Sequence, residues 1–493
     1  MLIFFKYLKY NLHFNFLSFY TIYLYLYYKY TNNITKKQIL KYKNLVIKSG
    51  CLTIKIAQNI NKLVDSINKN DPNYIFFNTV FNSFYENCEI HSFDYTKKIF
   101  KDELNINVDD DFIIFKEDAN IKSGSIAQIY KAIPKKKNRF IENFDNYAIK
   151  IVHPEIDIQI DYLLQYIKIY DYFFRNYYFL GTIFNLLDIK FIYENLSKQN
   201  NMINEHENIN YFYDYYIDNE FICIPKPIIS TKNILIMEFI DAIDITSLNN
   251  NIIDNQNKMI KLLWVLIFFY KDNIIFLKNM HGDLHDFNWK VNKNDYTKLV
   301  IFDFGFIVKK SSLIDSTFDM QKIMADLIYS MDIKNLKLLS ECVGEFIINL
   351  SPEEKNILKE EFIEYAINNN FFKTNISSLE NLMTFSIYKK MRLNPLLINI
   401  CIMTLGIKKA TDTYIHPKIS RQQMLLFHYI SQVNFFKEKK IFSNMCNITE
   451  KYYIKNSDFL NYISSNNNTI INLSLTLPKD SNNNIDSDLS YEI

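Results

Sequence analysis

Glycine and proline are scarce in this chain of 493 residues, which contains 7 glycines and 9 prolines. That scarcity excludes collagen-like and Pro/Gly-rich low-complexity proteins. The six cysteines lie far apart without a Cys-x-x-Cys pair, which argues against a disulfide framework or a zinc site and is typical of reduced, packed thiols. The formal net charge of +2 argues against nucleic-acid binding, because such surfaces carry a clear basic excess.

What the chain has in abundance is apolar residues, at 48% of the sequence. This fraction supports a sizeable core. The length allows two or three domains, or one large enzyme with two lobes.

The first thirty residues form a hydrophobic segment. Residues 14–28 are almost all Phe, Leu, Ile and Tyr, and lysines lie on both sides. The run is shorter than the roughly 20 apolar residues of a spanning helix, and it is rich in tyrosine, an interfacial residue. A membrane anchor or interfacial helix and a packed aromatic helix both remain open. A cleaved signal peptide is disfavoured because no small-residue cleavage site follows.

Residues 31–110 are predicted to be helical, because apolar positions recur at three- and four-residue spacing. Within this region Lys55 and Gln58 lie one turn apart on a helix face. On spacing alone, the default interpretation of that face is a solvated one.

A strand, a turn at residues 122–125 and a second strand are predicted between residues 111 and 132. The next predicted strand, residues 147–152, has Lys150 at its centre. A charge in so apolar a strand is costly without a partner. In a kinase-type fold such a lysine binds the phosphates of the nucleotide and pairs with a glutamate from the next helix. The alternative is an edge-strand lysine that points to water.

Two carboxylates and an amide follow short apolar runs later in the chain. Asp283 and Asn288 lie in the stretch 281–289, and Asp303 begins Asp-Phe-Gly after the strand 298–302. Phosphoryl transfer needs one carboxylate to orient the attacking hydroxyl, and a second carboxylate with an amide oxygen to hold Mg²⁺. A buried polar turn between two strands is the alternative, but it does not require these residues in this order.

The remaining segments suggest two lobes. Residues 233–241 read as a buried strand that runs into a polar connector, typical of a hinge whose backbone groups can contact adenine. The apolar helix 259–270 is predicted to lie in the core of the larger lobe, which stays helical to about residue 460. Residues 461–493 are predicted to be a disordered, low-complexity tail.

The order of these motifs resembles the UbiB/ADCK family of atypical kinases, which is linked to ubiquinone biosynthesis. The resemblance covers about residues 45–420. It is carried by Lys55 and Gln58, by the nucleotide loop 121–132 with Ser125 and Gln128, by the strand 148–154 with Lys150, by Glu205 with Asn208, by the hinge 236–241 with Glu238, by 281–288 and by 303–305.

The resemblance implies an α+β, two-lobed protein-kinase-like fold with a helical N-terminal extension. The expected organisation is a hydrophobic segment (1–30), an extension (31–110), a small lobe (111–245), a large lobe (246–460) and a tail (461–493). It further implies ATP and Mg²⁺ as cofactors, and ATP hydrolysis coupled to membrane-lipid or isoprenoid-lipid partners. The protein would then be membrane-associated or cytoplasmic, in a reducing compartment.

The site residues implied by the resemblance have distinct roles. Asp283 would orient the acceptor, Lys150 paired with Glu205 would bind phosphates, and Asn288 and Asp303 would hold Mg²⁺. The further nucleotide-binding residues implied are Ser125, Gln128, Glu238, Lys55 and Gln58.

The sequence also departs from the family pattern. Ala57 replaces the glycine of the Lys-x-Gly-Gln motif, and Gln199 and Asn201 replace an acidic pair before Glu205. The alanine-rich loop has become Lys-Ser-Gly at 122–124, and Asp-Phe replaces Pro-Gly at 286–287. None of these changes removes the lysine, the glutamate, the two aspartates or the asparagine on which ATP and Mg²⁺ binding depends.

Three other functions fit part of the pattern. A small-molecule phosphotransferase of the aminoglycoside or choline kinase type shares the Asp and Asn motifs, but it is not expected to carry the extension or the Ser-Ile-x-Gln loop. A conventional protein kinase would need a Gly-x-Gly-x-x-Gly loop, His-Arg-Asp and Ala-Pro-Glu, which this chain lacks. The lost acidic pair leaves a catalytically silent nucleotide-binding scaffold as the third alternative.

Overall fold

The computed structural model describes the chain in part, and all described residues belong to one unit, residues 1–415. Shorter pieces or single positions are described between residues 51 and 58, at 164–165, and between 262 and 274, 323 and 331, and 381 and 407. The predicted tail, 461–493, lies outside the described residues. The continuous ranges are 2–50, 72–86, 88–115, 121–135, 144–162, 197–248, 277–284, 287–309, 334–347 and 350–373.

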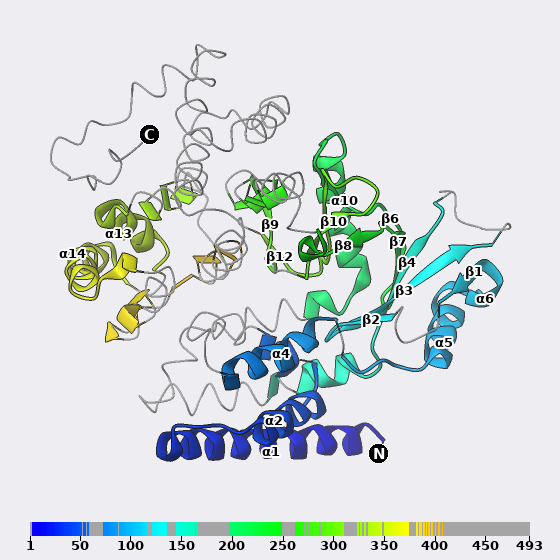
Figure 1. The fold of residues 1–493 in the computed structure, drawn as a ribbon, viewed down its shortest axis with the longest axis horizontal. Helices are drawn as coiled ribbons and strands as arrows, with labels where there is room; N and C mark the ends of the chain where they lie inside the picture. Colours follow the sequence, from blue (N-terminus) through cyan, green and yellow to red (C-terminus); the bar gives the residue numbers. More distant parts are fainter. Residues whose placement is uncertain are drawn as a thin grey trace, which may run out of the picture. The chain divides into compact units, whose positions relative to one another are not determined.

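The N-terminal part is helical and is built from α1 (Leu2–Thr31), α2 (Lys36–Lys48) and α4 (Pro72–Glu86) (Figure 1). A capping box begins α2: the Thr35 side chain accepts from the Gln38 N–H, and the Gln38 side chain accepts from the Thr35 N–H. One apolar cluster joins the three helices, with Leu17, Ile39, Val46, Ile54, Ala57, Val80, Phe81 and Phe84 buried in it. The predicted helical extension is therefore confirmed where it is described.

The first helix extends well beyond the apolar run that the sequence picks out. It spans 30 residues and begins before the first lysine. Among the described helices, none combines the length and the apolar character that crossing a bilayer requires.

A sheet of six antiparallel strands follows in the chain. The strand order is β1-β3-β4-β7-β6, and β2 pairs with β3. The sequence predicts two strands between residues 111 and 132, but the structure has three, because the short β1 pairs with the second half of β3. The bounds are β1 (Phe112–Ile114), β2 (Ile121–Ser123), β3 (Ala127–Pro134), β4 (Tyr147–Val152), β6 (Pro227–Ser230) and β7 (Ile234–Glu238).

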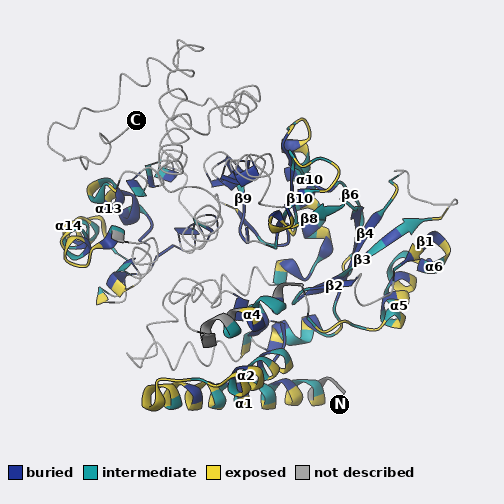
Figure 2. Cartoon of the chain, in the orientation of Figure 1, coloured by how far each residue is buried: buried dark blue, intermediate teal, exposed yellow. Residues whose placement is uncertain are grey.

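The central strand β4 is buried along its whole length (Figure 2). Ile149 and Ile151 pack into a cluster with Phe100 of α5 (Phe93–Leu104). Successive side chains of a strand point to opposite faces, so Lys150 points to the other face of the sheet. The helix α10 (Met202–Tyr216) contacts β6 and β7 of this sheet.

Two smaller sheets carry the predicted catalytic segments. One has the order β5-β11-β10-β8, and in the other β9 pairs with β12. The strand predicted at residues 298–302 is β11, which forms an antiparallel hairpin with β10 between Asp283 and Asp303. The bounds are β5 (Ile222–Cys223), β8 (Ala242–Ile243), β9 (Asn279–His281), β10 (Trp289–Asn292), β11 (Leu299–Ile301) and β12 (Ile307–Lys309).

The described part of the chain after these sheets is helical. The helices α13 (Leu336–Glu345) and α14 (Pro352–Asn368) pack on each other, and Ser351 and Glu354 form the capping box of α14. Short elements complete the described structure: α6 (Val108–Asp111), η2 (Ile245–Ser247) and η4 (Phe371–Lys373). The domain boundaries given by the sequence stay predictions.

Truncation of Ile149 tests the role of β4 as the core of the first sheet. Its side chain is fully buried, so Ile149→Ala should lower the free energy of unfolding by about 2–5 kcal/mol. The matched control is Ile113→Ala on β1, where the side chain is 53% exposed and the change should stay within about 0.5 kcal/mol. Urea unfolding followed by tryptophan fluorescence measures both, and equal losses would contradict the packing described.

Candidate active site

Strand pairing brings the two predicted catalytic segments together. His281 at the end of β9 pairs with Ile307 at the start of β12. Asp283, just after β9, therefore lies near Asp303 in the segment that enters β12. The Gly282 N–H donates to the Phe306 carbonyl at 2.8 Å, and a Cβ at Gly282 would lie 2.8 Å from the Phe306 ring. Glycine is therefore required at this position by close packing.

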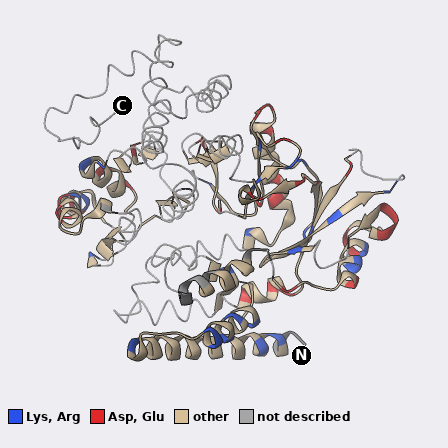
Figure 3. Cartoon of the chain, viewed as in Figure 1, with Lys and Arg blue, Asp and Glu red and all other residues tan. Residues whose placement is uncertain are grey.

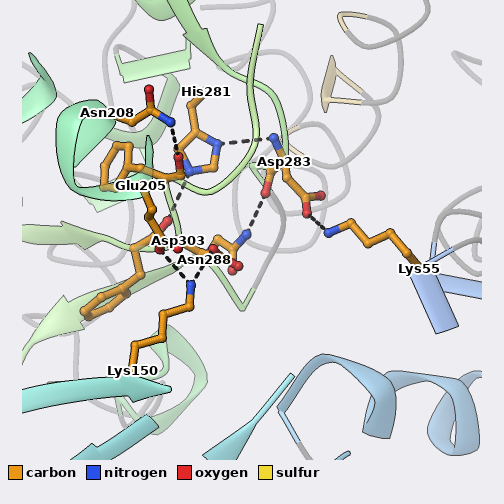
Figure 4. A network of polar contacts seen from close by, with 10 residues as sticks. Lys55, Lys150, Glu205, Asn208, His281, Asp283, Asn288 and Asp303 are labelled. Atoms are coloured by element: carbon orange, nitrogen blue, oxygen red, sulfur yellow. Dashed lines mark hydrogen bonds and ion pairs between the residues drawn. The ribbon is translucent and has the colours of Figure 1, made fainter. Parts of the chain in front are cut away.

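Lys150 lies between two carboxylates (Figure 4). Its Nζ is 2.7 Å from Glu205 Oε1 and 3.1 Å from Asp303 Oδ1. Glu205 belongs to the first turn of α10 and is 2% exposed, whereas the Asp303 side chain is 45% exposed. The predicted Lys150–Glu205 pair is thus present in the structure, and the edge-strand alternative for this lysine is wrong.

The charges of this cluster stabilise one another. Burial alone would lower the pKa of Lys150, but Asp303 and Glu205 hold it above its ordinary value. Desolvation would raise the pKa of Asp303, but Lys150 and Lys55 outweigh it and lower the pKa to about 2. Near neutral pH, Lys150 is therefore a cation and Asp303 a carboxylate.

His281 supports the loop that carries Asp283. The Asp283 N–H donates to His281 Nδ1 at 3.2 Å, so the ring proton lies on Nε2 and is donated to the Phe302 carbonyl at 3.1 Å. Burial lowers the pKa of His281, which keeps the ring neutral. The Asn273 side chain accepts from the His281 N–H at 2.9 Å and donates to the His281 carbonyl at 3.4 Å.

Asn288 and Asp303 have the donor chemistry of a Mg²⁺ site. Asn288 Nδ2 donates to the Asp283 carbonyl at 2.8 Å, which fixes the amide and leaves its oxygen as the metal-ligating atom. Asp303 has φ 57°, a left-handed conformation that is uncommon for residues other than glycine and recurs at functional sites. Carboxylate and amide oxygens are the ligands that Mg²⁺ prefers, so these residues fit the ion.

Lys55 reaches the site from the N-terminal extension. Its Nζ forms an ion pair with Asp283 Oδ2, and the two side chains are 16% and 6% exposed. Gln58 is also buried, and its Nε2 donates to the Phe84 carbonyl at 2.8 Å. The solvated face expected from spacing alone is therefore wrong. Lys55 contacts the predicted catalytic carboxylate, whereas Gln58 binds the backbone of α4.

Gln128 lies away from this cluster. In the β3–β4 register Ile129 is opposite Lys150 and Gln128 is opposite Ile151, so Gln128 points to the α5 side of the sheet. It is fully buried and forms hydrogen bonds with the backbone of His91, accepting at 2.8 Å and donating at 3.3 Å. The structure therefore does not bring the side chain of Gln128 to Lys150, despite the predicted nucleotide contact.

Ser125 and Glu238 belong to separate segments of the first sheet. Ser125 is half-buried in the turn between β2 and β3. Glu238 ends β7, and its N–H donates to the Lys226 carbonyl at 2.8 Å, while the Phe239 N–H donates to Asn146 at 3.2 Å. The nucleotide contacts of Ser125 and Glu238 stay predictions. At the hinge, the Glu238 and Phe239 N–H groups already donate to backbone carbonyls, so other groups would have to bind the nucleotide.

The two residues that replace the acidic pair have separate positions. A Cβ at Gly305 would lie 3.5 Å from Gln199 Cγ and 3.4 Å from Glu205 Oε2, so Gln199 lies beside the Asp-Phe-Gly motif. Asn201 is the N-cap of α10 and accepts from the Ile203 N–H at 3.1 Å. The second position therefore helps to start the helix that carries Glu205.

The helix α10 also holds the Asp-Phe-Gly motif directly. Asn208 Nδ2 donates to the Phe304 carbonyl at 2.9 Å. The buried Phe304 ring packs on Phe212 and His281, at 4.7 and 5.0 Å between centroids. One helix thus positions both the partner of Lys150 and the backbone next to Asp303.

The sequence reading missed a chain of polar groups behind the nucleotide loop. His91 and His153 face each other with their Nδ1 atoms 2.9 Å apart. His153 Nε2 is 3.1 Å from the Gly124 carbonyl, and His91 Nε2 is 3.1 Å from Thr96 Oγ1. Thr96 in turn lies 2.9 Å from the hydroxyl of Tyr130, which accepts from Gln128.

One set of hydrogen-bond directions satisfies this whole chain. The Gly124 carbonyl can only accept, so His153 donates from Nε2 and accepts at Nδ1 from His91. His91 then accepts from Thr96 at Nε2, so both rings are neutral. In the sequence, Gln128 and the His-Pro that follows the Lys150 strand belong to recognisable motifs, but nothing marks His91 as the partner of His153.

Together these features define a protein-kinase-like site. The Lys150–Glu205 pair lies beneath an antiparallel sheet, and Asp303 and Asn288 lie beside the second carboxylate, Asp283. The chain belongs to the ABC1 atypical kinase-like family, whose domain model matches residues 83–343, more than half of the sequence. This confirms the resemblance to the UbiB/ADCK kinases and the α+β kinase-like fold class.

Comparison with curated proteins found no match. Two similar solved structures are Rv3197 of Mycobacterium tuberculosis, in complex with erythromycin, and the Rio2 kinase of Chaetomium thermophilum, in an ADP/Mg²⁺-phosphoaspartate complex. The first is 18% identical with a TM-score of 0.39, and the match covers 66% of this chain and 83% of the Rv3197 chain. The second is 12% identical with a TM-score of 0.25 and covers 68% and 96%. The assignment rests on the family model.

Acidification should destabilise the fold through the histidine pair. Burial lowers the pKa of His91 from 6.5 to about 3 and that of His153 to about 4. Below about pH 6.5 the unfolded chain therefore binds protons that the folded chain does not, so stability falls as the pH falls toward 4. Thermal melts at about pH 7 and about pH 5 should show this loss.

A paired variant separates this effect from general acid sensitivity. His91→Gln/His153→Gln should be less stable at pH 7, yet lose less stability between pH 7 and pH 5 than the unaltered protein. His206→Gln, on α10, removes a histidine outside the pair. This variant should still lose the stability that His91 and His153 account for between pH 7 and pH 5. An unchanged pH dependence in the double variant would contradict the neutral pair.

Proposed function

We propose that this protein is an atypical kinase or ATPase that binds Mg-ATP. The observation that carries the proposal is the position of Lys150 between Glu205 and Asp303, in the same cluster as Asp283 and Asn288. A buried lysine that is paired with two carboxylates carries a cost in desolvation, which favours a functional role.

Each residue has a defined task in this proposal. Glu205 holds the Lys150 ammonium in position to bind the α- and β-phosphates, while Asn288 and Asp303 supply oxygen ligands for Mg²⁺. The bound ion would neutralise the charge that develops on the phosphate oxygens. Asn208 holds the segment with Asp303, and His281 holds the loop with Asp283, each through a hydrogen bond to the backbone.

The contact between Lys55 and Asp283 bears on the acceptor. Asp283 is the carboxylate that would orient an attacking hydroxyl, and one of its oxygens is already paired with an ammonium group from the extension. A bulky acceptor has to displace Lys55, whereas water does not. This favours ATP hydrolysis over transfer to exposed peptides, and the family resemblance supports a role in isoprenoid-lipid metabolism.

Loss of the metal-binding carboxylate should abolish nucleotide turnover. Asp303→Asn should lower the rate of Mg²⁺-dependent ATP hydrolysis by about a hundredfold or more, because the charge that holds the ion is gone. Lys150→Met should weaken nucleotide binding, but it leaves Glu205 buried without its partner and can destabilise the fold. Asp303→Asn keeps the Lys150–Glu205 pair and is the decisive variant.

The matched control is Lys97→Met on α5, where a lysine is exchanged at an exposed position. It should leave the rate and the nucleotide-induced thermal shift unchanged. If the unaltered protein showed a thermal shift but no turnover, the silent scaffold would replace the enzyme. If Asp303→Asn were as active as the unaltered protein, the metal assignment would be wrong.

Removal of the Lys55 side chain tests the acceptor side of the site. Lys55→Ala removes the ion pair with Asp283 Oδ2, so phosphate transfer to a protein acceptor, including the protein itself, should rise several-fold. Radiolabelled ATP measures the transfer, and Lys48→Ala, an exposed lysine at the end of α2, is the control. Transfer to choline or an aminoglycoside would favour the small-molecule phosphotransferase instead.

A further inference from the structure

Exposed residues recur along the length of α1 (Figure 2), and many of them have large apolar side chains. We call the residues of its outer face that carry the argument the outer stripe. Their exposed fractions range from 44% to 71%. Single exposed apolar residues are ordinary, but a continuous row of them marks an interaction surface. The outer stripe consists of Leu8, Leu12, Phe16, Phe19, Ile22 and Leu26.

The outer stripe follows from helical spacing. Its members recur every three or four residues, which places them within roughly a third of the helix circumference. The buried residues Tyr10, Leu17 and Leu24 recur every seven residues and lie on the opposite side. The helix is about 45 Å long, at about 1.5 Å per residue, so the stripe is an extended surface.

The inner face of α1 is occupied by protein. Leu17 packs in the cluster that α1 shares with α2 and α4. Near its N-terminal end, Lys6 Nζ forms an ion pair with Glu155 at 3.0 Å, and the Tyr10 hydroxyl donates to Glu155 at 3.0 Å. Gln159 Nε2 donates to the same hydroxyl at 3.0 Å. These contacts hold one side of the helix against the protein, so its outer face is available to a partner.

The charge around the outer stripe has one sign. Residues 1–64 contain ten lysines and no aspartate or glutamate. Lys9 and Lys29 lie roughly a quarter of a turn to either side of the stripe, and Lys36, Lys37 and Lys41 of α2 are also exposed. Figure 3 shows α1 and α2 with lysines and without acidic residues.

We propose that the outer stripe docks α1 flat on the surface of a lipid bilayer that contains anionic phospholipids. An apolar face flanked by lysines is the arrangement that lies in a membrane interface: the apolar side chains enter the acyl region and the lysines reach the phosphates. Aromatic side chains such as Phe16 and Phe19 suit this depth. A second copy of the chain is disfavoured, because its lysines would face these lysines without acidic partners.

This docking surface is independent of the nucleotide chemistry proposed above. It lies on α1, which contributes none of the residues of the Lys150 cluster. Docking through α1 would bring the extension that carries Lys55 to the membrane. The surface can therefore be tested without reference to turnover.

Vesicle flotation of the full chain tests the proposal. The probes are vesicles of phosphatidylcholine alone and of phosphatidylcholine mixed with phosphatidylserine. The protein should float with the mixed vesicles and much less with the neutral ones, and added salt should weaken the binding. Phe16→Ser/Phe19→Ser should bind at least about tenfold more weakly, because burying a Phe side chain is worth more than a tenfold change in affinity.

The matched control exchanges two equally exposed apolar residues elsewhere. Ile357→Ser/Ile367→Ser on α14 changes side chains that are each 62% exposed and should leave vesicle binding unchanged. Both double variants alter exposed residues, so circular dichroism and the nucleotide-induced thermal shift should match the unaltered protein. A failure of the nucleotide proposal would appear in the thermal shift, and a failure of the docking proposal only in flotation.

Three results would overturn the docking proposal. Equal flotation of the Phe16/Phe19 variant and the unaltered protein would remove the outer stripe from the interaction. Equal binding to neutral and mixed vesicles would remove the anionic lipid. Absence of vesicle binding, together with a dimer that the Phe16/Phe19 variant loses in size-exclusion chromatography, would assign the stripe to a second copy of the chain.

Discussion

The buried ammonium of Lys150 is the constraint on which the rest of the site depends. A lysine at the centre of a strand between two other strands has to be neutralised where it lies, because moving a lone charge out of water costs several kcal/mol. Glu205 and Asp303 meet that need from different elements, one at the start of α10 and one after β11. The helix and the Asp-Phe-Gly segment are therefore both fixed relative to the first sheet.

The N-terminal extension takes part in the same electrostatic arrangement. Lys55 pairs with Asp283, and together with Lys150 it lowers the pKa of Asp303. Behind the sheet, His91 from the segment between α4 and α5 joins His153 and the turn at Gly124. The extension thus contacts the predicted catalytic carboxylate Asp283 directly and the turn that carries Gly124 through His153.

Much of the site could be predicted from the sequence, because its residues follow short apolar runs in a set order. Lys150, Glu205, Asp283, Asn288 and Asp303 lie in one cluster, as the motifs indicate. The face of β3 that Gln128 occupies could not be predicted, because its motif carries no information on it and a shift of one residue changes the face. The solvated reading of Lys55 and Gln58 failed because helix spacing does not reveal what packs on that face.

By itself, the sequence determined the types of residues available for phosphoryl transfer, the apolar N-terminal helix and the excess of lysine around it. Hydrophobic periodicity and motif order are local properties, so they can be read along the chain. Only the tertiary structure decided which side chains meet: the pairing of Lys55 with Asp283, the neutral histidine pair, and the division of α1 into a packed face and an exposed one. Lys55 and Asp283 are 228 positions apart, and His91 and His153 are 62 apart. Such contacts depend on how helices and sheets pack, and local sequence does not specify that.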